Sequence, residues 1–89
     1  MNLRQLQFFR EVVRTGFNVT AAAERLHTSQ PGVSKQLRLL EEELGITLFA
    51  RDGRQLTHLT PAGEAVLEYA ERALREIDNL SREASDNRD

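Results

Sequence analysis

The chain has 89 residues, a length that suffices for one small domain, and it contains no cysteine. Its 12 Lys and Arg against 14 Asp and Glu give a net charge of -2. The missing cysteines exclude a disulfide framework, a thiolate nucleophile and any cysteine-ligated metal, and we expect no cofactor. No window approaches the roughly 20 apolar residues of a membrane span, and the N-terminus lacks a secretory apolar stretch, so we expect a soluble, unprocessed, cytoplasmic protein without a membrane partner.

Residues 3–15 predict a first helix that packs on a core. Apolar side chains recur there at spacings of three and four, which makes one apolar stripe along an amphipathic helix. The stripe consists of Leu3, Leu6, Phe9 and Val13. Asn2 can cap the start of this helix, and Gly16 can end it.

A short second helix is predicted over residues 19–26, with Asn18 as its cap. This run is rich in alanine, and such small side chains would let a neighbouring helix approach closely. The turn that follows lacks the glycine that many helix-turn-helix motifs carry at its centre, because His27 or Thr28 stands there.

A third helix is predicted over residues 30–44, with Ser29 as its cap, a proline in its first turn and Gly45 at its end. At about 100° per residue, its side chains divide into an apolar inward face and a polar outward face. The inward face holds Val33, Leu37, Leu40 and Leu44. The outward face holds Pro31, Ser34, Lys35 and Arg38. In a helix-turn-helix, the second of the two helices is the one that normally enters a DNA groove.

The outward face of the third helix carries donors near a helix N-terminus, whose free N–H groups suit a phosphate. Gln30 can pair with the edge of adenine, and Lys35 or Arg38 can bind guanine. No acidic residue lies from Thr28 to Arg38, and residues 1–60 hold 8 Lys and Arg against 6 Asp and Glu, so a local positive surface is possible despite the net charge. Taken alone, such a face is also what any solvated helix shows.

An acidic run and three hydroxyl residues each allow a structural interpretation as well as a functional one. The run Glu41–Glu43 could be imagined as a cation site, but consecutive helical residues point in different directions, so we expect a solvated face that keeps phosphate away from the end of the helix. Three hydroxyl residues are ordinary cap or turn residues that could each also donate a hydrogen bond to a phosphate: Thr20, Thr28 and Ser29.

A two-stranded wing is predicted after the third helix. The dipeptide Asp52-Gly53 supplies two positive-φ residues for a tight hairpin turn, and it is flanked by strands over residues 46–51 and 54–59. Arg51 and Arg54 adjoin the turn, where they could reach phosphates or the minor groove. A hairpin tip also carries charge merely for solubility, and both interpretations stay open.

A final helix is predicted to begin at Thr60 and Pro61. Its apolar positions repeat in a strict four-three pattern, which fits a partner helix. These positions are Val66, Ala70, Ala73, Ile77, Leu80 and Ala84. We therefore expect residues 1–60 to form a DNA-binding domain and residues 61–89 a linker helix for dimerisation, with frayed residues from Ser85 to Asp89.

Five stretches are familiar in combination: Leu3–Leu6 with Phe9; Ala21–Leu26; Thr28–Gln36; Leu40–Gly45 with Leu48, Phe49 and Arg51; and Leu59–Gly63. Together they resemble the N-terminal domain of LysR-type transcription regulators along nearly the whole chain. Three segments look most like the CysB-like branch of that family, which governs sulfur assimilation: Asn18–Thr20, Ser29–Gln36 and Arg51–Arg54.

The resemblance implies a mainly α fold, with three helices and a two-stranded wing as a winged helix-turn-helix and a long linker helix after it. It implies binding to partly palindromic, double-stranded promoter DNA in the cytoplasm, on the nucleoid, as a homodimer or tetramer. By motif position it assigns groove reading to Gln30, Pro31, Ser34 and Lys35. It assigns backbone contacts to Ser29 and Arg38, and wing contacts to Arg51 and Arg54. Full-length members continue into an effector-binding domain, so we expect an isolated domain without effector binding.

Three classes of function can be compared. The leading hypothesis is sequence-selective duplex binding, and it requires the polar side of the helix that begins at Gln30 to be unobstructed. The second is a protein-interaction module in which the helical seam is the whole function, without DNA binding. The third, an enzyme, has little support, because His27 and His58 are too few for a zinc or general-base site and no nucleophile–base pair can be assembled.

Overall fold

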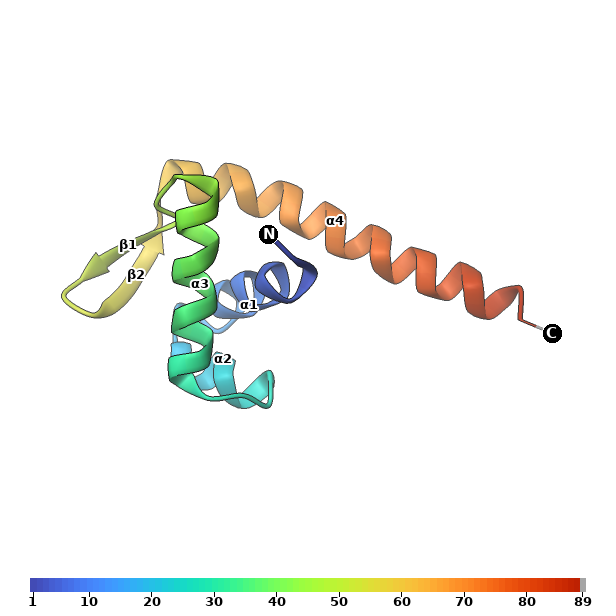
Figure 1. The fold of residues 1–89 in the computed structure, drawn as a ribbon, viewed down its shortest axis with the longest axis horizontal. Coiled ribbons are helices and arrows are strands. Elements are labelled where there is room, and N and C mark those ends of the chain that lie inside the picture. The colour runs from blue at the N-terminus through green and yellow to red at the C-terminus, as the bar shows by residue number, and fades with distance from the viewer. Residues whose placement is uncertain (89) are drawn as a thin grey trace.

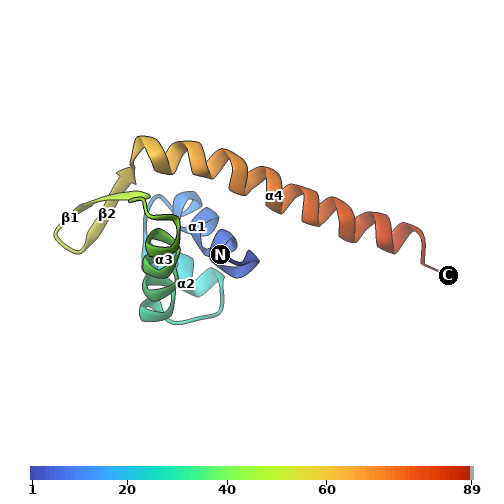
Figure 2. The ribbon, with the colours of Figure 1, turned by 45° about the horizontal axis from the view of Figure 1, so that its top comes forward.

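The computed structural model describes residues 1–88, which form a cluster of three helices, a hairpin and one long projecting helix (Figure 1). In chain order the elements are α1 Leu3–Arg14, α2 Val19–Arg25, α3 Gln30–Leu44, β1 Phe49–Asp52, β2 Gln55–Leu59 and α4 Pro61–Asp86. The predicted fold, a winged helix-turn-helix followed by a long helix, is confirmed. The molecule is elongated, 53 × 26 × 21 Å, because α4 continues well past the helical cluster, as Figure 2 shows from a second direction.

Helix α1 begins at a capping box in which the Asn2 side chain accepts the N–H of Gln5 at 2.8 Å and the Gln5 side chain accepts the N–H of Asn2. The predicted apolar stripe was partly wrong. Leu3 is 39% exposed, whereas Phe8 is buried beside Phe9. Helix α1 packs against α2, α3 and α4. These three neighbours, rather than the spacing of apolar residues, decide which side chains of α1 are buried. The buried side chains include Val12 and the polar Gln5.

Helices α2 and α3 form the predicted helix-turn-helix, and both begin at the expected caps. Ala22 and Ala23 are buried, so the small side chains of α2 allow α3 to pack closely on it. His27 in the turn has a φ of +54°, the left-handed region that glycine adopts more easily. A histidine therefore adopts in this turn a left-handed conformation that glycine reaches at lower cost. Gly45 ends α3 with a φ of +71°, as predicted.

The hydrophobic core lies where α1, α2, α3 and the base of the hairpin meet. The Phe9 and Phe49 rings pack edge to face with centroids 5.5 Å apart, and Phe17 meets the same Phe49 ring at 6.2 Å. Phe49 is the first residue of β1, so its burial joins the hairpin directly to the core of the helical cluster. The inward face predicted for α3 is buried at Val33, Leu37 and Leu40, and Leu44 is half-buried.

The hairpin is antiparallel, as predicted, but its turn was assigned one residue too early. Asp52 pairs with Gln55, so the two-residue turn is Gly53-Arg54, and of the two residues proposed for it only Gly53 has a positive φ, +62°. β1 starts at Phe49 instead of residue 46, because Leu48 is drawn into the core before pairing begins. An irregularity in the pairing interrupts the register between Ala50 and Arg51.

Helix α4 starts at the predicted Thr60 cap and continues to Asp86, so part of the segment expected to fray is helical. Asp89 lies outside the described residues. The predicted seam divides into two parts. Ala70 is buried in the core of its own chain and Val66 is packed against it, whereas the later seam positions from Ala73 onward are exposed. The four-three pattern could not distinguish the two, because packing on α1 uses the same small and apolar residue types. Within residues 1–88, no helix combines the length and apolarity needed to cross a membrane.

Candidate nucleic-acid interface

The outward face of α3 is open to solvent. Gln30, Pro31, Lys35 and Arg38 are exposed, and Ser34 is half-buried. Neither the hairpin nor α4 covers these turns, since the hairpin lies to one side of α3 and α4 crosses its far end (Figure 1). The requirement that the polar side beginning at Gln30 be unobstructed is therefore met.

The N-terminus of α3 is capped in a way that leaves donors available. The Ser29 hydroxyl oxygen accepts the N–H of Gly32 at 3.1 Å, so the Ser29 hydroxyl hydrogen can still be donated to another group. Pro31 has no backbone N–H, but because it stands in the first turn of α3 no intrahelical hydrogen bond is lost. Thr28 is half-buried, and its N–H donates to the Ala23 carbonyl at 3.0 Å. The backbone of Thr28 therefore stabilises the turn between α2 and α3.

The beginning of α2 lies beside the beginning of α3. The Thr20 hydroxyl donates to the Gln30 side-chain oxygen at 3.4 Å. This contact orients the Gln30 carboxamide so that its amino group remains free to donate. Thr20 is exposed and lies next to the predicted groove-reading residues.

A groove runs between α3 and the wing, at the edge of the polar face of α3. Its lining comes from α2, α3 and the hairpin: Val19, Gln30, Ser34, Leu37, Arg38, Arg51, Gly53, Arg54 and Leu56. A second hollow adjoins it and shares Gln30 and Arg54. The structure thus gathers Thr20, Gln30, Ser34 and Arg38 with the wing arginines, although they are spread over more than 30 residues of sequence.

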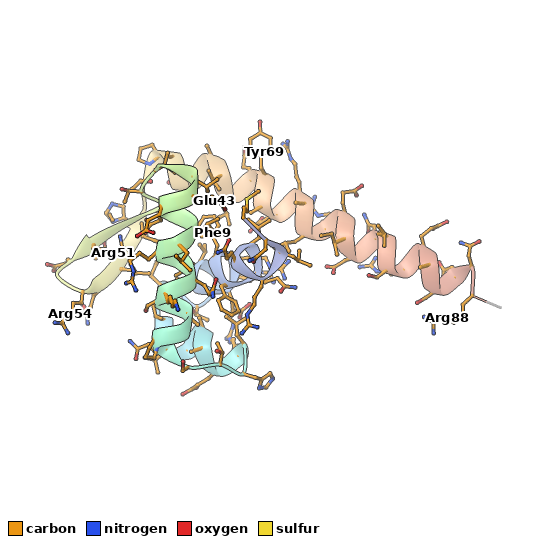
Figure 3. All side chains as sticks on the ribbon, viewed as in Figure 1. Phe9, Glu43, Arg51, Arg54, Tyr69 and Arg88 are labelled. Carbon is orange, nitrogen blue, oxygen red and sulfur yellow. The ribbon has the colours of Figure 1, made fainter. Side chains whose placement is uncertain are left out.

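The two wing arginines have different surroundings (Figure 3). Arg54 lies in the turn at the hairpin tip, and it has no ion-pair partner among the described residues. Arg51 is closer to α3, where its Nη2 lies 3.0 Å from a carboxylate oxygen of Glu41. The charge of Arg54 is therefore free for an external anion, whereas that of Arg51 is balanced within the chain.

The solvated face predicted for Glu41–Glu43 was wrong for Glu41. Its side chain is only 11% exposed, and one carboxylate oxygen accepts the N–H groups of Leu48 at 2.7 Å and Phe49 at 3.4 Å. A signal was present in the sequence: Glu41 follows Leu37 by four residues and so lies beside the buried face of α3. Glu43 pairs with the N-terminal ammonium, and Glu42 is exposed as predicted.

Helix α4 carries an exposed apolar seam, which we define as Tyr69, Ala73, Ile77, Leu80 and Ala84. Tyr69 was missed from sequence because it interrupts the four-three pattern, yet it is 67% exposed and points away from the helical cluster (Figure 3). The Arg72 guanidinium lies 5.4 Å from the centre of its ring. Leu74 was also missed, and it is buried beside α1.

Comparison with known proteins gives a consistent result. A family model described as bacterial regulatory helix-turn-helix protein, lysR family, matches residues 3–64. The transcriptional regulator CysB of Burkholderia cenocepacia is 49% identical over 86 residues, which cover 97% of this chain and 28% of that protein, and the regulator SsuR of the same organism is 51% identical over 84 residues, 94% of this chain and 27% of that protein. The chain thus spans about a quarter of the length of these curated relatives.

Solved structures agree with the sequence relatives. The BenM DNA-binding domain in complex with benA site 1 DNA has a TM-score of 0.86 and 38% identity, covering 96% of this chain and 93% of that one. The CbnR DNA-binding domain in complex with DNA has a TM-score of 0.80 and 43% identity, covering 96% of this chain and 99% of that one. In both comparisons nearly the whole of each chain is matched.

Proposed function

The chain belongs to the LysR family of bacterial regulatory helix-turn-helix proteins, and from this premise we propose that it binds double-stranded promoter DNA selectively as the DNA-binding part of a longer transcription regulator. The observation that carries the proposal is the open polar face of α3 beside the groove it forms with the wing. An exposed helix with donors at its N-terminus fits a major groove, and a hairpin alongside fits the neighbouring backbone. The DNA complexes of the similar BenM and CbnR domains support it.

Within this proposal the contacts divide by chemistry. One set faces the bases: Gln30, Pro31, Ser34 and Lys35. The amide, hydroxyl and ammonium groups of this set can hydrogen-bond to the base edges, and the proline ring can contact a thymine methyl group. A second set contacts phosphates and holds the domain in register: Thr20, Thr28, Ser29, Arg38 and Arg54. Arg51 lies in the same wing, but its charge is paired with Glu41. The net charge of -2 does not oppose this, since the acidic excess lies in α4, away from the proposed surface.

We infer that two copies pair through the exposed seam of α4 and place two α3 helices on the two halves of a partly palindromic site. Ile77 is 39% exposed and Leu80 is 68% exposed, so both offer apolar surface that this chain leaves uncovered. Ala70, which the four-three pattern places in the seam, lies in the chain's own core and cannot contribute. In the longer protein, further pairing into a tetramer and effector binding would depend on segments beyond this chain.

The similarity to CysB and SsuR favours promoters of sulfur-metabolism genes as the targets, in the cytoplasm and on the nucleoid. Recovery of chromosomal fragments bound by the chain tests this assignment. Enrichment of sulfur-metabolism promoters would support it, and enrichment of unrelated promoters would overturn it. The relatives are transcription regulators, and we propose no catalysed reaction for this chain.

Selection of bound duplexes from a random pool is the decisive experiment for DNA binding. The proposal predicts a recovered motif with two related half-sites whose spacing reports the distance between the two α3 helices. The competing function, a protein-interaction module whose only active surface is the seam, predicts no shift of mixed genomic duplex even at low salt, where phosphate contacts are strongest. Failure to bind any duplex at low salt would favour that competitor.

A further inference from the structure

We propose that Glu41 is a positioning residue for DNA binding, because its carboxylate fixes the wing against α3; this inference rests on the proposed function. One oxygen of the carboxylate accepts the N–H groups of Leu48 and Phe49, at the start of β1. The other oxygen lies 3.0 Å from Nη2 of Arg51, further along the same strand. A single side chain of the proposed recognition helix therefore holds the wing at three points.

A carboxylate beside a DNA-binding surface is electrostatically unfavourable unless its charge is balanced. A free carboxylate close to a duplex repels phosphate and weakens binding. The Glu41 carboxylate is instead largely withdrawn from solvent, and its charge is met by one guanidinium and two backbone N–H groups. Hydrogen bonds with an ionised partner are shorter and stronger than neutral ones, so the link can hold a geometry. Its contribution to binding is therefore expected through position rather than through contact.

The segment held by Glu41 is also held from its opposite side. The Leu48 carbonyl accepts the N–H of Thr60 at 3.0 Å, and Gly63 of α4 packs directly on the same carbonyl. The Phe49 ring is buried in the core. The base of the wing is thus fixed on the α4 side by backbone contact and on the α3 side by Glu41, and only the α3 side depends on a side-chain charge.

The two wing arginines would then have separate tasks. Arg51, paired with Glu41, links the wing to α3, whereas Arg54 at the tip has no ion pair within residues 1–88 and can meet a phosphate. This division differs from the equal roles that the family resemblance assigns to the two residues. It makes Arg51 a positioning residue and leaves Arg54 as the cation that the wing presents to DNA.

The test compares E41Q with E42Q in the whole 89-residue chain. Both variants remove one negative charge from adjacent residues of α3, but Glu42 is exposed and makes none of these bonds. The readout is the ratio of affinities for a duplex selected by the unaltered chain and for a mixed-sequence duplex. We expect E42Q to strengthen both affinities slightly and leave the ratio unchanged. We expect E41Q to lower the ratio about tenfold, because a wing released from its charged hydrogen bonds no longer holds α3 in one register on the selected duplex.

A second pair of variants tests the inference at the two wing arginines. Both are exposed, so their replacement should leave the folded structure intact. We expect R51Q to lower the same ratio while leaving the dependence of binding on salt concentration unchanged. We expect R54Q to reduce the salt slope by about one unit, as loss of one phosphate contact does, with little change in the ratio. If E41Q does not fold, this pair decides alone.

Equal ratios for E41Q and E42Q would overturn the positioning role, as would a salt slope that falls as much for R51Q as for R54Q. Either result would leave the proposed function intact, provided that the unaltered chain still binds its selected duplex. Absence of duplex binding by the unaltered chain would instead overturn the proposed function, and the role of Glu41 with it.

Discussion

Single side chains decide how the α3 surface would distinguish one duplex from another. Gln30 and Arg38 both lie on the exposed face, but the chemistry of an amide differs from that of a guanidinium. An amide reads base edges through paired donors and acceptors, whereas a guanidinium also binds phosphate irrespective of sequence. The two residues therefore allow a comparison of sequence reading with general attraction.

We expect Gln30→Ala to cost roughly 1 to 3 kcal/mol on a selected duplex and to relax the preference at one base pair. We expect Arg38→Ala to weaken binding to all sequences and to reduce the salt slope by about one unit. Titration of both variants against selected and mixed duplexes at several salt concentrations checks this. Equal losses on both duplexes for Gln30→Ala would count against base reading.

Two glycines occupy the same place in two helices and differ only in their neighbours. Gly63 and Gly32 are each the third residue of a helix that begins with a hydroxyl cap and a first-turn proline. A Cβ on Gly63 would lie 2.1 Å from the Leu48 backbone oxygen, whereas a Cβ on Gly32 would meet only side-chain atoms, the nearest being the Ser29 hydroxyl at 3.0 Å. The Leu48 backbone cannot rotate away from a Cβ on Gly63, whereas the Ser29 side chain can move away from a Cβ on Gly32.

We therefore expect Gly63→Ala to lower the free energy of unfolding by about 1 to 3 kcal/mol, because α4 and the base of the wing must separate. Gly32→Ala is the matched control, and it should change that free energy by less than about 1 kcal/mol. Urea denaturation of both variants measures the difference. Similar losses in the two variants would show that α4 shifts on the wing at little cost.

The turn of the helix-turn-helix illustrates how a secondary-structure element can tolerate an unusual residue. Three of its neighbours support it: Leu26 caps α2, Thr28 donates its N–H to Ala23, and Ser29 caps α3. His27 itself is exposed, and within residues 1–88 its side chain makes no hydrogen bond or ion pair. Its left-handed conformation is thus imposed by the two helices that it joins.

We expect His27→Gly to raise the free energy of unfolding by about 0.5 to 1 kcal/mol. Relief of the left-handed conformation is worth roughly 1 to 2 kcal/mol, and the greater freedom of glycine in the unfolded chain offsets part of it. His27→Ala, which keeps a Cβ, is the control and should bring no gain. Thermal or urea unfolding checks both, and equal changes would contradict the conformational explanation.

At the level of the assembled protein, α4 has two tasks along its length. One face of its first half covers the helical cluster through Gly63, Ala70 and Leu74, and the exposed seam runs beside that face from Tyr69 to Ala84. Alanine occupies two of the five seam positions, so each seam contact buries little apolar area. We expect pairing of the isolated chain to be weak and dependent on concentration.

Replacement of Ile77 and Leu80 by Lys should give a monomer in sedimentation, because two charges would face the partner helix without compensation. A control on the opposite side of α4 combines N79K with E68Q, which adds the same net charge away from the seam. The control should sediment as the unaltered chain does. A variant of Ile77 and Leu80 that remains a dimer at a concentration where the unaltered chain is a dimer would show that copies pair through another surface.

The sequence by itself determined the four helices and the residues at which they begin. Caps at Asn2, Asn18, Ser29 and Thr60 act on backbone groups within the next few residues, and Gly45 supplies a local conformation, so their effects do not depend on distant parts of the chain. The polar face of α3 was predictable for the same reason, since helical periodicity alone separates Lys35 and Arg38 from the buried leucines.

Only the tertiary structure decided the burial of Glu41, Gly63 and Ala70. Glu41 receives its partners from residues seven to ten positions away, Gly63 meets a backbone oxygen of another element, and Ala70 is covered by α1. These contacts arise from the packing of elements against one another, and periodicity within one helix cannot encode which neighbour covers which face. For the same reason the sequence predicted the exposed polar face of α3 but not the contacts of Glu41 with the wing.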